Sequence, residues 1–196
     1  VQMVPAPPSK PKTERLMQLA DLVVVTGSQA NVRAGYSSGT PALGVGAGNV
    51  VSIVDETADI ADAAAKIAAS KTFDNATSCS SEHAVIAVDA VYDKLVAALA
   101  AEGGYCLDAA QTAHLEGIHW HNGKLTSKLL AKDIDVVLAE TGFAGTAPDN
   151  TSFLVAPQSE FGPDHPMTGE KMSRFLALHR AGDFDEAMEK AVAIQN

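Results

Sequence analysis

Four short apolar runs, separated by stretches with helical spacing, constrain the fold of this chain more than any other feature. The runs are DLVVVTGS (21–28), VVSIVD (50–55), EHAVIAVD (82–89) and RFLALHR (174–180). Each has the length and composition of a buried strand. Strands that alternate with helices predict an α/β fold with an open, mostly parallel sheet. Because aromatic residues make up only 5% of the chain, we expect a core of Ala, Val, Leu and Ile.

The stretches between these runs predict helices. In the clearest of them, which begins near Asp59, four apolar residues share one face: Ile60, Ala64, Ile67 and Ala68. Asp59 or Thr57 is the expected N-cap of that helix. Further helices are expected over residues 12–20, 28–39, 90–104, 107–133 (with a break at Asn122-Gly123) and 183–195. Residues 40–49 are expected as a glycine-rich loop, and residues 136–140 and 152–157 as short strands.

Charge and composition exclude several classes of function. The net charge of −10 opposes nucleic-acid binding, which needs a basic surface. No run approaches the length of a membrane span, and no signal peptide is visible. Two cysteines make no disulfide framework, so a reducing cytoplasm is expected. The chain lacks an initiator Met and stops within a helical pattern, so we expect a piece of something longer.

Three motifs suggest ligands, but each fits the pattern of such a site poorly. The loop GVGAG (44–48) precedes an expected strand, whereas a dinucleotide fingerprint opens a helix, so we expect a tight loop that lets backbone approach something else. Three histidines and a cysteine match no zinc spacing, and no metal is expected: Cys106, His114, His119 and His121. Lys124, Lys128 and Lys132 recur every four residues, which favours a solvated helix face over a phosphate site.

Cys79 is the sharpest candidate for chemistry. It lies in FDNATSCSSEH (73–83), among small and hydroxylated residues rather than the apolar residues that bury a structural thiol. A thiol needs help to act as a nucleophile at neutral pH, and backbone N–H groups beside it can stabilise an oxyanion. His83 is close in sequence, but no protease-like Cys–His pair is evident. The residues alone therefore suggest a reactive thiol and leave open a polar loop that happens to contain one.

Three segments, in this order, resemble the CoA-acylating branch of the aldehyde dehydrogenase superfamily. They are VVVTGSQANVRAGYSSGTPALGVGAGN, TADI…SKTFDNATSCSSE and GEKMSRFLALHRAGDFDEAMEKA, which together cover nearly the whole chain. The likeness extends to acetaldehyde dehydrogenases and to the aldehyde-dehydrogenase half of bifunctional aldehyde–alcohol dehydrogenases. It implies a three-layer catalytic domain beside a remnant of a Rossmann-like cofactor domain.

The resemblance implies roles for five residues. Cys79 would attack the aldehyde carbonyl and form a thiohemiacetal, which passes hydride to NAD (or NADP) and leaves a thioester. Gly27 and Ser28 match the turn beside the cofactor, and Glu170 matches the glutamate that holds the nicotinamide ribose. Hydrolytic relatives carry a water-activating glutamate on or beside the position of Gly44, and no acid lies between residues 40 and 49 here. This absence fits coenzyme A as the acyl acceptor.

Three features depart from the pattern that the resemblance implies. His83 stands where relatives have Gln or Asn, and Ser173-Arg174 replaces a Ser-Pro. The hydroxyl-rich TSCSSE looks more like the sulfoacetaldehyde-oxidising relatives, and a nearby Arg or His would suit an anionic substrate. The expected substrate is therefore a short aldehyde, either acetaldehyde or sulfoacetaldehyde.

The resemblance also divides the chain into expected domains. Residues 1–40 would be a remnant of the NAD-binding domain, residues 41–183 the catalytic domain, and residues 184–196 the start of a return to the cofactor domain. On this division the 196 residues alone should bind NAD weakly and turn over little. A homo-oligomer is expected. Two alternatives stay open: a hydrolytic enzyme that uses a base from elsewhere, and a non-catalytic domain kept for assembly.

Overall fold

The chain forms two compact units, with the division after Ala47. A computed structural model describes residues 3–162 and 164–195. The first unit is Val1–Ala47 and the second Gly48–Asn196. The division lies a few residues beyond the boundary expected after Thr40, and the binding roles assigned to the expected domains stay predictions.

The first unit is a β–α–β arrangement preceded by a helix. It contains α1 (Lys10–Leu19), β1 (Val23–Thr26), α2 (Gln29–Tyr36) and β2 (Ala42–Val45), and β1 pairs with β2 in parallel. Strand β2 lies where a loop was expected. Glycine allows α2 to approach it, because a Cβ on Gly44 would lie 2.6 Å from Cγ1 of Val32 and 2.8 Å from Cε2 of Tyr36.

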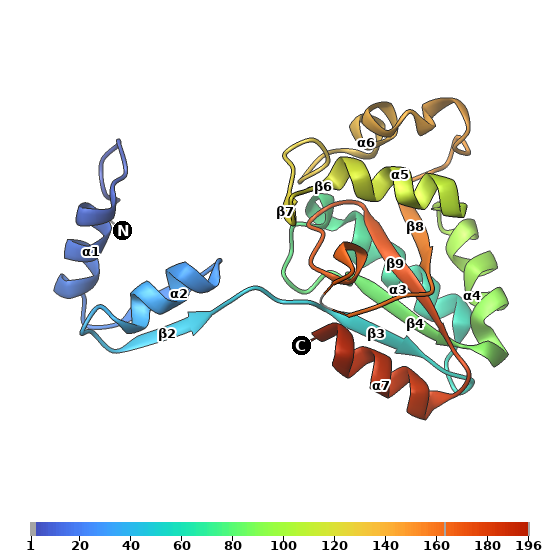
Figure 1. Cartoon of the computed structure of the whole chain (residues 1–196), viewed down its shortest axis with the longest axis horizontal. Coiled ribbons are helices and arrows are strands. Elements are labelled where there is room, and N and C mark those ends of the chain that lie inside the picture. Colours follow the sequence, from blue (N-terminus) through green and yellow to red (C-terminus); the bar gives the residue numbers. More distant parts are fainter. Residues whose placement is uncertain (1–2, 163, 196) are drawn as a thin grey trace. The chain divides into compact units, whose positions relative to one another are not determined.

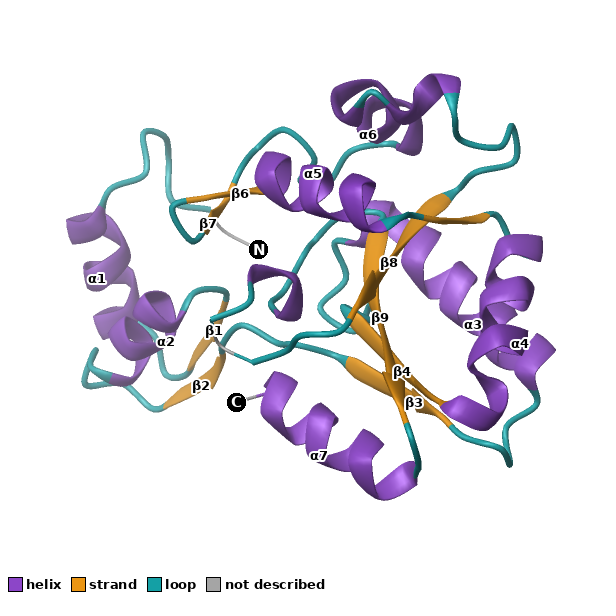
Figure 2. Cartoon of the chain, turned by 45° about the vertical axis from the view of Figure 1, so that its right-hand side comes forward, coloured by secondary structure: helices purple, strands orange, loops and turns teal. Residues whose placement is uncertain are grey.

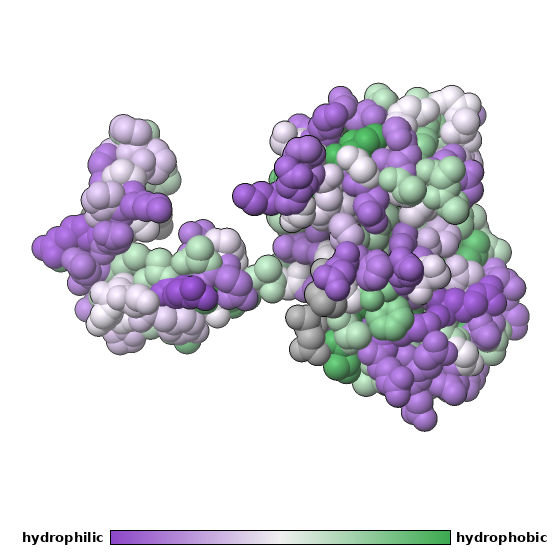
Figure 3. Space-filling view, in the orientation of Figure 1, coloured by the Kyte–Doolittle hydropathy of each residue, from purple (hydrophilic) through white to green (hydrophobic). Residues whose placement is uncertain are grey.

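The apolar residues of this first unit are largely exposed. The strand expected here is present as β1, but only Val23 of it is buried, so the expected burial is wrong for the rest of the strand. Helix α1 buries no residue. Four residues before and within the two strands are more than half exposed: Leu22, Val24, Leu43 and Val45. Figure 3 shows pale hydrophobic colour on the surface of this unit, between hydrophilic side chains.

The second unit is built on a five-stranded sheet in which all neighbouring strands are parallel, as the alternating pattern predicts. Across the sheet the order is β3 (Val51–Val54), β4 (Ala84–Val88), β9 (Phe175–Ala181), β8 (Phe153–Gln158) and β5 (Gly104–Cys106). Figure 1 labels the first four of these strands. Strand β5 was not expected, because its three residues are too few to show a period.

Helices cover both faces of this sheet. Helices α3 (Ile60–Thr72) and α4 (Asp89–Ala101) lie on one face, and α5 (Ala109–His119) and α7 (Phe184–Gln195) on the other (Figure 2). Asp59 caps α3 as expected, by accepting a hydrogen bond from the N–H of Asp62 (3.1 Å). This arrangement confirms the predicted α/β class.

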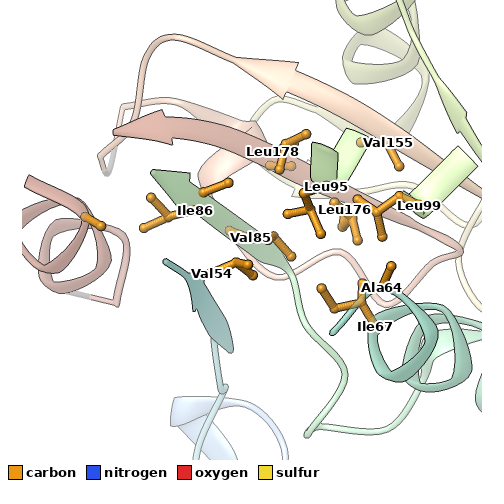
Figure 4. Packing of buried hydrophobic residues seen from close by; sticks show 14 of the residues in the cluster. Val54, Ala64, Ile67, Val85, Ile86, Leu95, Leu99, Val155, Leu176 and Leu178 are labelled. Carbon is orange, nitrogen blue, oxygen red and sulfur yellow. The ribbon is translucent and has the colours of Figure 1, made fainter. Parts of the chain in front are cut away.

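Small aliphatic side chains form the core, as the composition predicts. Every residue of β4 is buried, and Leu95, Leu99 and Ala64 pack against the sheet from the helices (Figure 4). Fully burying one leucine side chain stabilises the fold by about 1.5–3 kcal/mol. A second cluster, which includes Leu115, Leu129 and Phe175, lies beneath α5.

Two of the predictions for residues 120–141 are wrong. Residues 124–133 are not helical: β6 (Trp120–His121) and β7 (Lys124–Leu125) form a hairpin. Its turn is Asn122-Gly123, both with positive φ, which suits a two-residue hairpin loop. Residues 136–140, expected as a strand, belong to helix α6 (Ile134–Thr141), which ends at the left-handed Gly142. Apolar period alone does not separate short buried strands from short helices.

Candidate active site

Two loops that precede adjacent strands carry the candidate residues of the second unit. Cys79 lies in the loop between α3 and β4, and Glu170 lies in the loop before β9. Since β4 and β9 are parallel neighbours, both loops lie at the amino ends of their strands. Many open α/β sheets bind ligands at the carboxyl ends instead.

A left-handed turn presents Cys79. After α3, the short 3₁₀ segment η1 (Phe73–Ala76) contains three successive residues with positive φ: Asp74 (46°), Asn75 (53°) and Ala76 (57°). Non-glycine residues rarely adopt this conformation, and such outliers gather at functional sites. Cys79 lies three residues after Ala76, and it is exposed to solvent.

The hydroxyl groups around Cys79 bond mostly to residues of the same loop. Ser78 and Ser80 hydroxyls lie 2.9 Å apart, and the Thr77 hydroxyl donates to the backbone carbonyl of Asp74 (2.7 Å). The backbone N–H of Ser81 donates to the carbonyl of Ser78 (3.0 Å), which closes the turn around Cys79. The hydroxyl groups that distinguish this segment in the sequence therefore stabilise the conformation of the loop.

The glycine-rich loop meets the backbone of this turn. A Cβ on Gly48 would lie 3.6 Å from the carbonyl oxygen of Cys79, an ordinary contact distance. This fits the expectation that the loop lets backbone approach something else. The side chain of the next residue, Asn49, donates from Nδ2 to the carbonyls of Thr168 (2.9 Å) and Ile194 (2.7 Å).

A buried lysine lies behind the turn. Lys71, on the last turn of α3, is 0% exposed, and its Nζ donates to the Ser81 hydroxyl (3.2 Å) and the Glu82 carbonyl (2.7 Å). Burial lowers the pKa of this amine to about 7, although Glu82 opposes the shift. A group that titrates near neutral pH thus contacts the segment that carries Cys79.

His83 connects the two loops. It is fully buried, and its Nδ1 accepts a hydrogen bond from the backbone N–H of Lys171 (3.2 Å). Burial, and then the charges of Lys71 and Lys171, lower the pKa of His83 to about 3, so the neutral ring carries its hydrogen on Nε2. Nε2 lies 3.9 Å from Oε1 of Glu170, whose side chain is 26% exposed. Burial raises the pKa of Glu170.

A second buried lysine shapes the loop before Glu170. Nζ of Lys171 donates to the carbonyls of Met167 (2.7 Å) and Gly169 (2.9 Å), around the 3₁₀ turn η3 (Pro166–Thr168). Burial, and then the charge of Lys71, lower the pKa of Lys171 far below its usual range. Each of the two loops is therefore held by one buried amine.

Arg174 joins the loop of Cys79 to the start of β9. Its Nε donates to Oδ1 of Asn75 (2.7 Å), and Asn75 lies four residues before Cys79. No carboxylate lies within ion-pair distance of Arg174 among the described residues. A guanidinium that has no carboxylate partner among the described residues thus bonds to the loop that carries the thiol.

The other three candidates lie in the first unit. Gly27 has a φ of 119° in the turn between β1 and α2, and the Ser28 hydroxyl caps α2 by accepting from the N–H of Asn31 (3.3 Å). A strand, a tight turn and a helix N-terminus form a suitable cradle for a nucleotide phosphate, so these residues fit NAD. Gly44 also has a packing role, because Val32 and Tyr36 occupy the space of any side chain there.

A cavity of about 500 Å³ opens beside Gly169, the residue before Glu170. Its lining residues are Asn49, Trp120, Gly123, Gly162, Asp164, His165, Pro166, Thr168, Gly169, Ala193 and Ile194. Neither Cys79 nor Glu170 is among them, so the cavity adjoins the candidate residues without containing them.

The histidines and lysines of the middle section lie apart from these loops or serve the fold. His119 is buried against Trp120 and Phe175, and its Nε2 lies 2.8 Å from the carbonyl of Lys171. His121 is exposed, and His114 lies beside Phe143. In the part of the chain that is described, no group of three His, Cys, Asp or Glu side chains is placed to hold a metal ion. The three exposed lysines do not share a helix face: Lys124, Lys128 and Lys132.

Sequence reasoning missed the two buried lysines. Lys71 had a detectable signal, because it continues the apolar face of α3 at four residues after Ile67 and seven after Ala64. A charged residue on an apolar helix face is a candidate for a buried polar contact. Lys171 had no such signal, because its loop has no regular period.

Across residues 3–162 and 164–195, no helix has the length and apolar character needed to cross a bilayer.

Comparison with known proteins extends this picture. No protein-family model matches the chain. A sulfoacetaldehyde dehydrogenase (acylating) from Cupriavidus necator is 48% identical over 194 residues, which is 99% of this chain and 39% of that protein. An acetylating aldehyde dehydrogenase from Geobacillus thermoglucosidasius has a similar structure, with a TM-score of 0.89 and 36% identity over 95% of this chain and 41% of that one.

A third relative shows a modified cysteine. The propionaldehyde dehydrogenase of Rhodopseudomonas palustris has been solved with bound CoA and an acylated cysteine, and it matches this chain with a TM-score of 0.86 and 29% identity. The match covers 96% of this chain and 43% of that protein. The 196 residues thus span about two fifths of the length of these relatives. In that part, the chain belongs to the family of CoA-acylating aldehyde dehydrogenases.

Proposed function

We propose that this chain carries the nucleophile of an enzyme that converts a short aldehyde, CoA and NAD (or NADP) into an acyl-CoA and the reduced nucleotide. The observation that supports this most directly is the exposed Cys79, three residues after the strained segment 74–76, in a chain homologous to acylating aldehyde dehydrogenases. A relative with an acylated cysteine and bound CoA supports the same chemistry. The proposal includes a cytoplasmic homo-oligomer.

In the proposed reaction, the Cys79 thiol adds to the aldehyde carbonyl: a carbon–sulfur bond forms, the carbonyl π bond breaks, and the proton lost by the thiol ends on the oxygen. When bound, NAD (or NADP) would supply the hydride acceptor that this oxidation needs, and the hydroxyl proton would pass to solvent. Gly27 and Ser28 would hold the nucleotide phosphates at the start of α2, and Glu170 would accept hydrogen bonds from a ribose. The acyl group then remains on Cys79 as a thioester.

The second half of the reaction needs no nicotinamide. The thiolate of CoA attacks the Cys79 thioester, a new thioester forms, and the Cys79 thiolate leaves. No acidic residue lies between residues 40 and 49 to activate water, so we propose that the acyl-enzyme is long-lived until CoA arrives. Because this step is reversible, an acyl-CoA should also acylate Cys79.

Acyl transfer tests the proposal directly. Incubation of the chain with acetyl-CoA should add one acetyl group, located at Cys79 by peptide mass spectrometry, and added CoA should remove it. Acetate release without CoA would indicate a hydrolytic enzyme. A Cys79 that stays unmodified while acetyl-CoA is in large excess would contradict the proposal. Formation of NADH from acetaldehyde or sulfoacetaldehyde, measured with and without CoA, extends the test to the complete reaction; because the 196 residues alone are expected to bind NAD weakly, a low rate there is expected and only its dependence on CoA is decisive.

Arg174 supports an anionic aldehyde as the finer substrate class. Its guanidinium bonds to Asn75 in the loop of Cys79 and has no ion-pair partner among the described residues. The relative from Cupriavidus necator is named for sulfoacetaldehyde. We therefore propose that Arg174 attracts the sulfonate of the substrate.

An Arg174→Met variant should lower the ratio of Cys79 acylation rates for sulfoacetyl-CoA over acetyl-CoA by about fivefold. One partly exposed charge interaction is worth on the order of 1 kcal/mol, which gives this factor. Arg180→Met is the matched control. The Arg180 guanidinium pairs with Asp89 and Asp93 at the carboxyl ends of β4 and β9, whereas the candidate loops lie at the amino ends of these strands. An unchanged ratio in Arg174→Met would exclude this role.

A further inference from the structure

The buried amine of Lys71 has no role in the proposed reaction, although it touches the turn that carries Cys79. Its two acceptors are the Ser81 hydroxyl (3.2 Å) and the Glu82 carbonyl (2.7 Å), which follow Cys79 by two and three residues. Ser81 is also fully buried. The amine therefore reaches across from α3 and bonds the trailing half of the turn.

A lysine is a costly choice for this position. Lys71 continues the face of α3 that buries Ala64, Ile67 and Ala68, where leucine or methionine would fill the space without the loss of an ammonium's hydration. Packing alone therefore does not account for an amine there. The two hydrogen bonds to the turn give a reason for it, since no apolar side chain would make them.

We propose that Lys71 is a positioning residue, which holds the Ser78–Glu82 segment so that the Cys79 thiol is aligned for acyl transfer. This inference rests on the proposed function of Cys79. A nucleophile on a turn must meet the carbonyl carbon at a defined angle and distance, and a displacement near 1 Å can cost about 100-fold in rate. A small, freely diffusing alkylating reagent has no such requirement.

The charge of Lys71 makes this role dependent on pH. The charged groups that face it are Glu82, which favours the ammonium, and Lys171, which opposes it; the neutral His83 lies beside both lysines. Burial brings the pKa of Lys71 to about 7. Below this pH the ammonium makes charge-assisted hydrogen bonds, which are stronger than those of the neutral amine that prevails above it.

The first experiment compares two rates at Cys79 in the whole chain: acetylation by acetyl-CoA and alkylation by iodoacetamide. Lys71→Met should lower acetylation about 10- to 100-fold while alkylation changes less than about threefold. Lys66→Met is the matched control, because Lys66 lies on the same helix with an exposed amine that pairs with Asp62. It should leave both rates unchanged. Equal acetylation rates in Lys71→Met and the wild type would overturn the inference.

A second variant and a pH profile cover the case in which Lys71→Met does not fold. Ser81→Ala removes one acceptor and should lower acetylation by about three- to tenfold. In the wild type, the ratio of acetylation to alkylation should fall as pH rises through about 7, because the ammonium is lost. Dividing by the alkylation rate removes the contribution of the Cys79 thiolate. A flat ratio, or an unchanged Ser81→Ala, would also overturn the inference.

The outcomes separate this inference from the proposed function. If acetyl-CoA leaves wild-type Cys79 unmodified, the proposed function fails first. If the wild type is acetylated and the Lys71 and Ser81 variants match it at every pH, only the positioning role fails.

Discussion

Replacement of Cys79 by serine should lower acylation by acetyl-CoA at least about 1000-fold, the largest effect that we expect from any single change. A serine hydroxyl is scarcely ionised at neutral pH, and no activating base contacts this side chain among the described residues. Because Cys79 is exposed, the substitution should leave folding intact. Intact-mass spectrometry over a time course measures the rate.

Cys106 gives the matched control within the same molecule. It is only partly exposed on β5, and burial raises the pKa of its thiol, so it carries less thiolate at neutral pH. Cys106→Ser should acylate as the wild type does, and iodoacetamide should alkylate Cys79 faster than Cys106. Acetyl label on Cys106, or acylation that persists in Cys79→Ser, would mean that Cys79 is not the nucleophile. Equal alkylation of the two thiols would favour the non-catalytic alternative.

The second unit should lose about 2–4 kcal/mol of unfolding free energy between pH 7.5 and pH 5.5. Three histidines are buried in neutral form, with pKa values lowered mainly by burial: His83 to about 3, and His119 and His179 to about 4. In the unfolded chain their pKa returns to about 6.5. The unfolded state then binds more protons as pH falls below 6.5, so stability declines by on the order of 1 kcal/mol per histidine at pH 5.5.

Other titratable groups change the size of this loss of stability but not its sign. The lowered pKa values of Lys71 and Lys171 act in the same direction, since each of these amines binds fewer protons in the folded state than in the unfolded one at pH values above its folded-state pKa. The raised pKa of Glu170 acts in the opposite direction, but at lower pH. The sum therefore keeps the sign set by the histidines.

Urea unfolding followed by tryptophan fluorescence measures this effect. The single tryptophan, Trp120, lies in the second unit with its ring centroid 4.6 Å from that of His119. His179→Leu should reduce the pH dependence by about a third, because it removes one of the three buried histidines, and no hydrogen bond to its buried Nε2 is found among the described residues. The exposed His121→Asn should leave it unchanged. Equal unfolding free energies at the two pH values would contradict the assignment of neutral buried histidines.

The sequence anticipated the parts of the fold that have a long or strong period. The strands beginning at Val51, Ala84 and Phe175 and the helix capped by Asp59 lie where the pattern put them. The prediction of short elements was mixed: the strand expected over residues 152–157 is β8, but residues 136–140 belong to α6 and residues 42–45 form β2. In segments this short, neighbouring packing and turn residues outweigh the local pattern.

For the site, the sequence singled out Cys79, and with the family resemblance it also singled out Glu170. It did not reveal how those two loops are joined. His83 contacts both loops because β4 and β9 are adjacent in the sheet, although the hydrogen-bonded pair His83 and Lys171 lies 88 residues apart in the sequence. Strand order depends on the packing of the whole sheet, so no local pattern encodes it.

The sequence by itself determined the alternating α/β class, the small-residue core and the polar setting of one thiol, because these follow from local period and composition. Only the tertiary structure decided that Lys71 and Lys171 are buried, that each bonds one loop, and that Arg174 reaches Asn75. Burial and long-range hydrogen bonds depend on which segments meet in space. The charges that look solvated in the sequence therefore include two that lie in the interior.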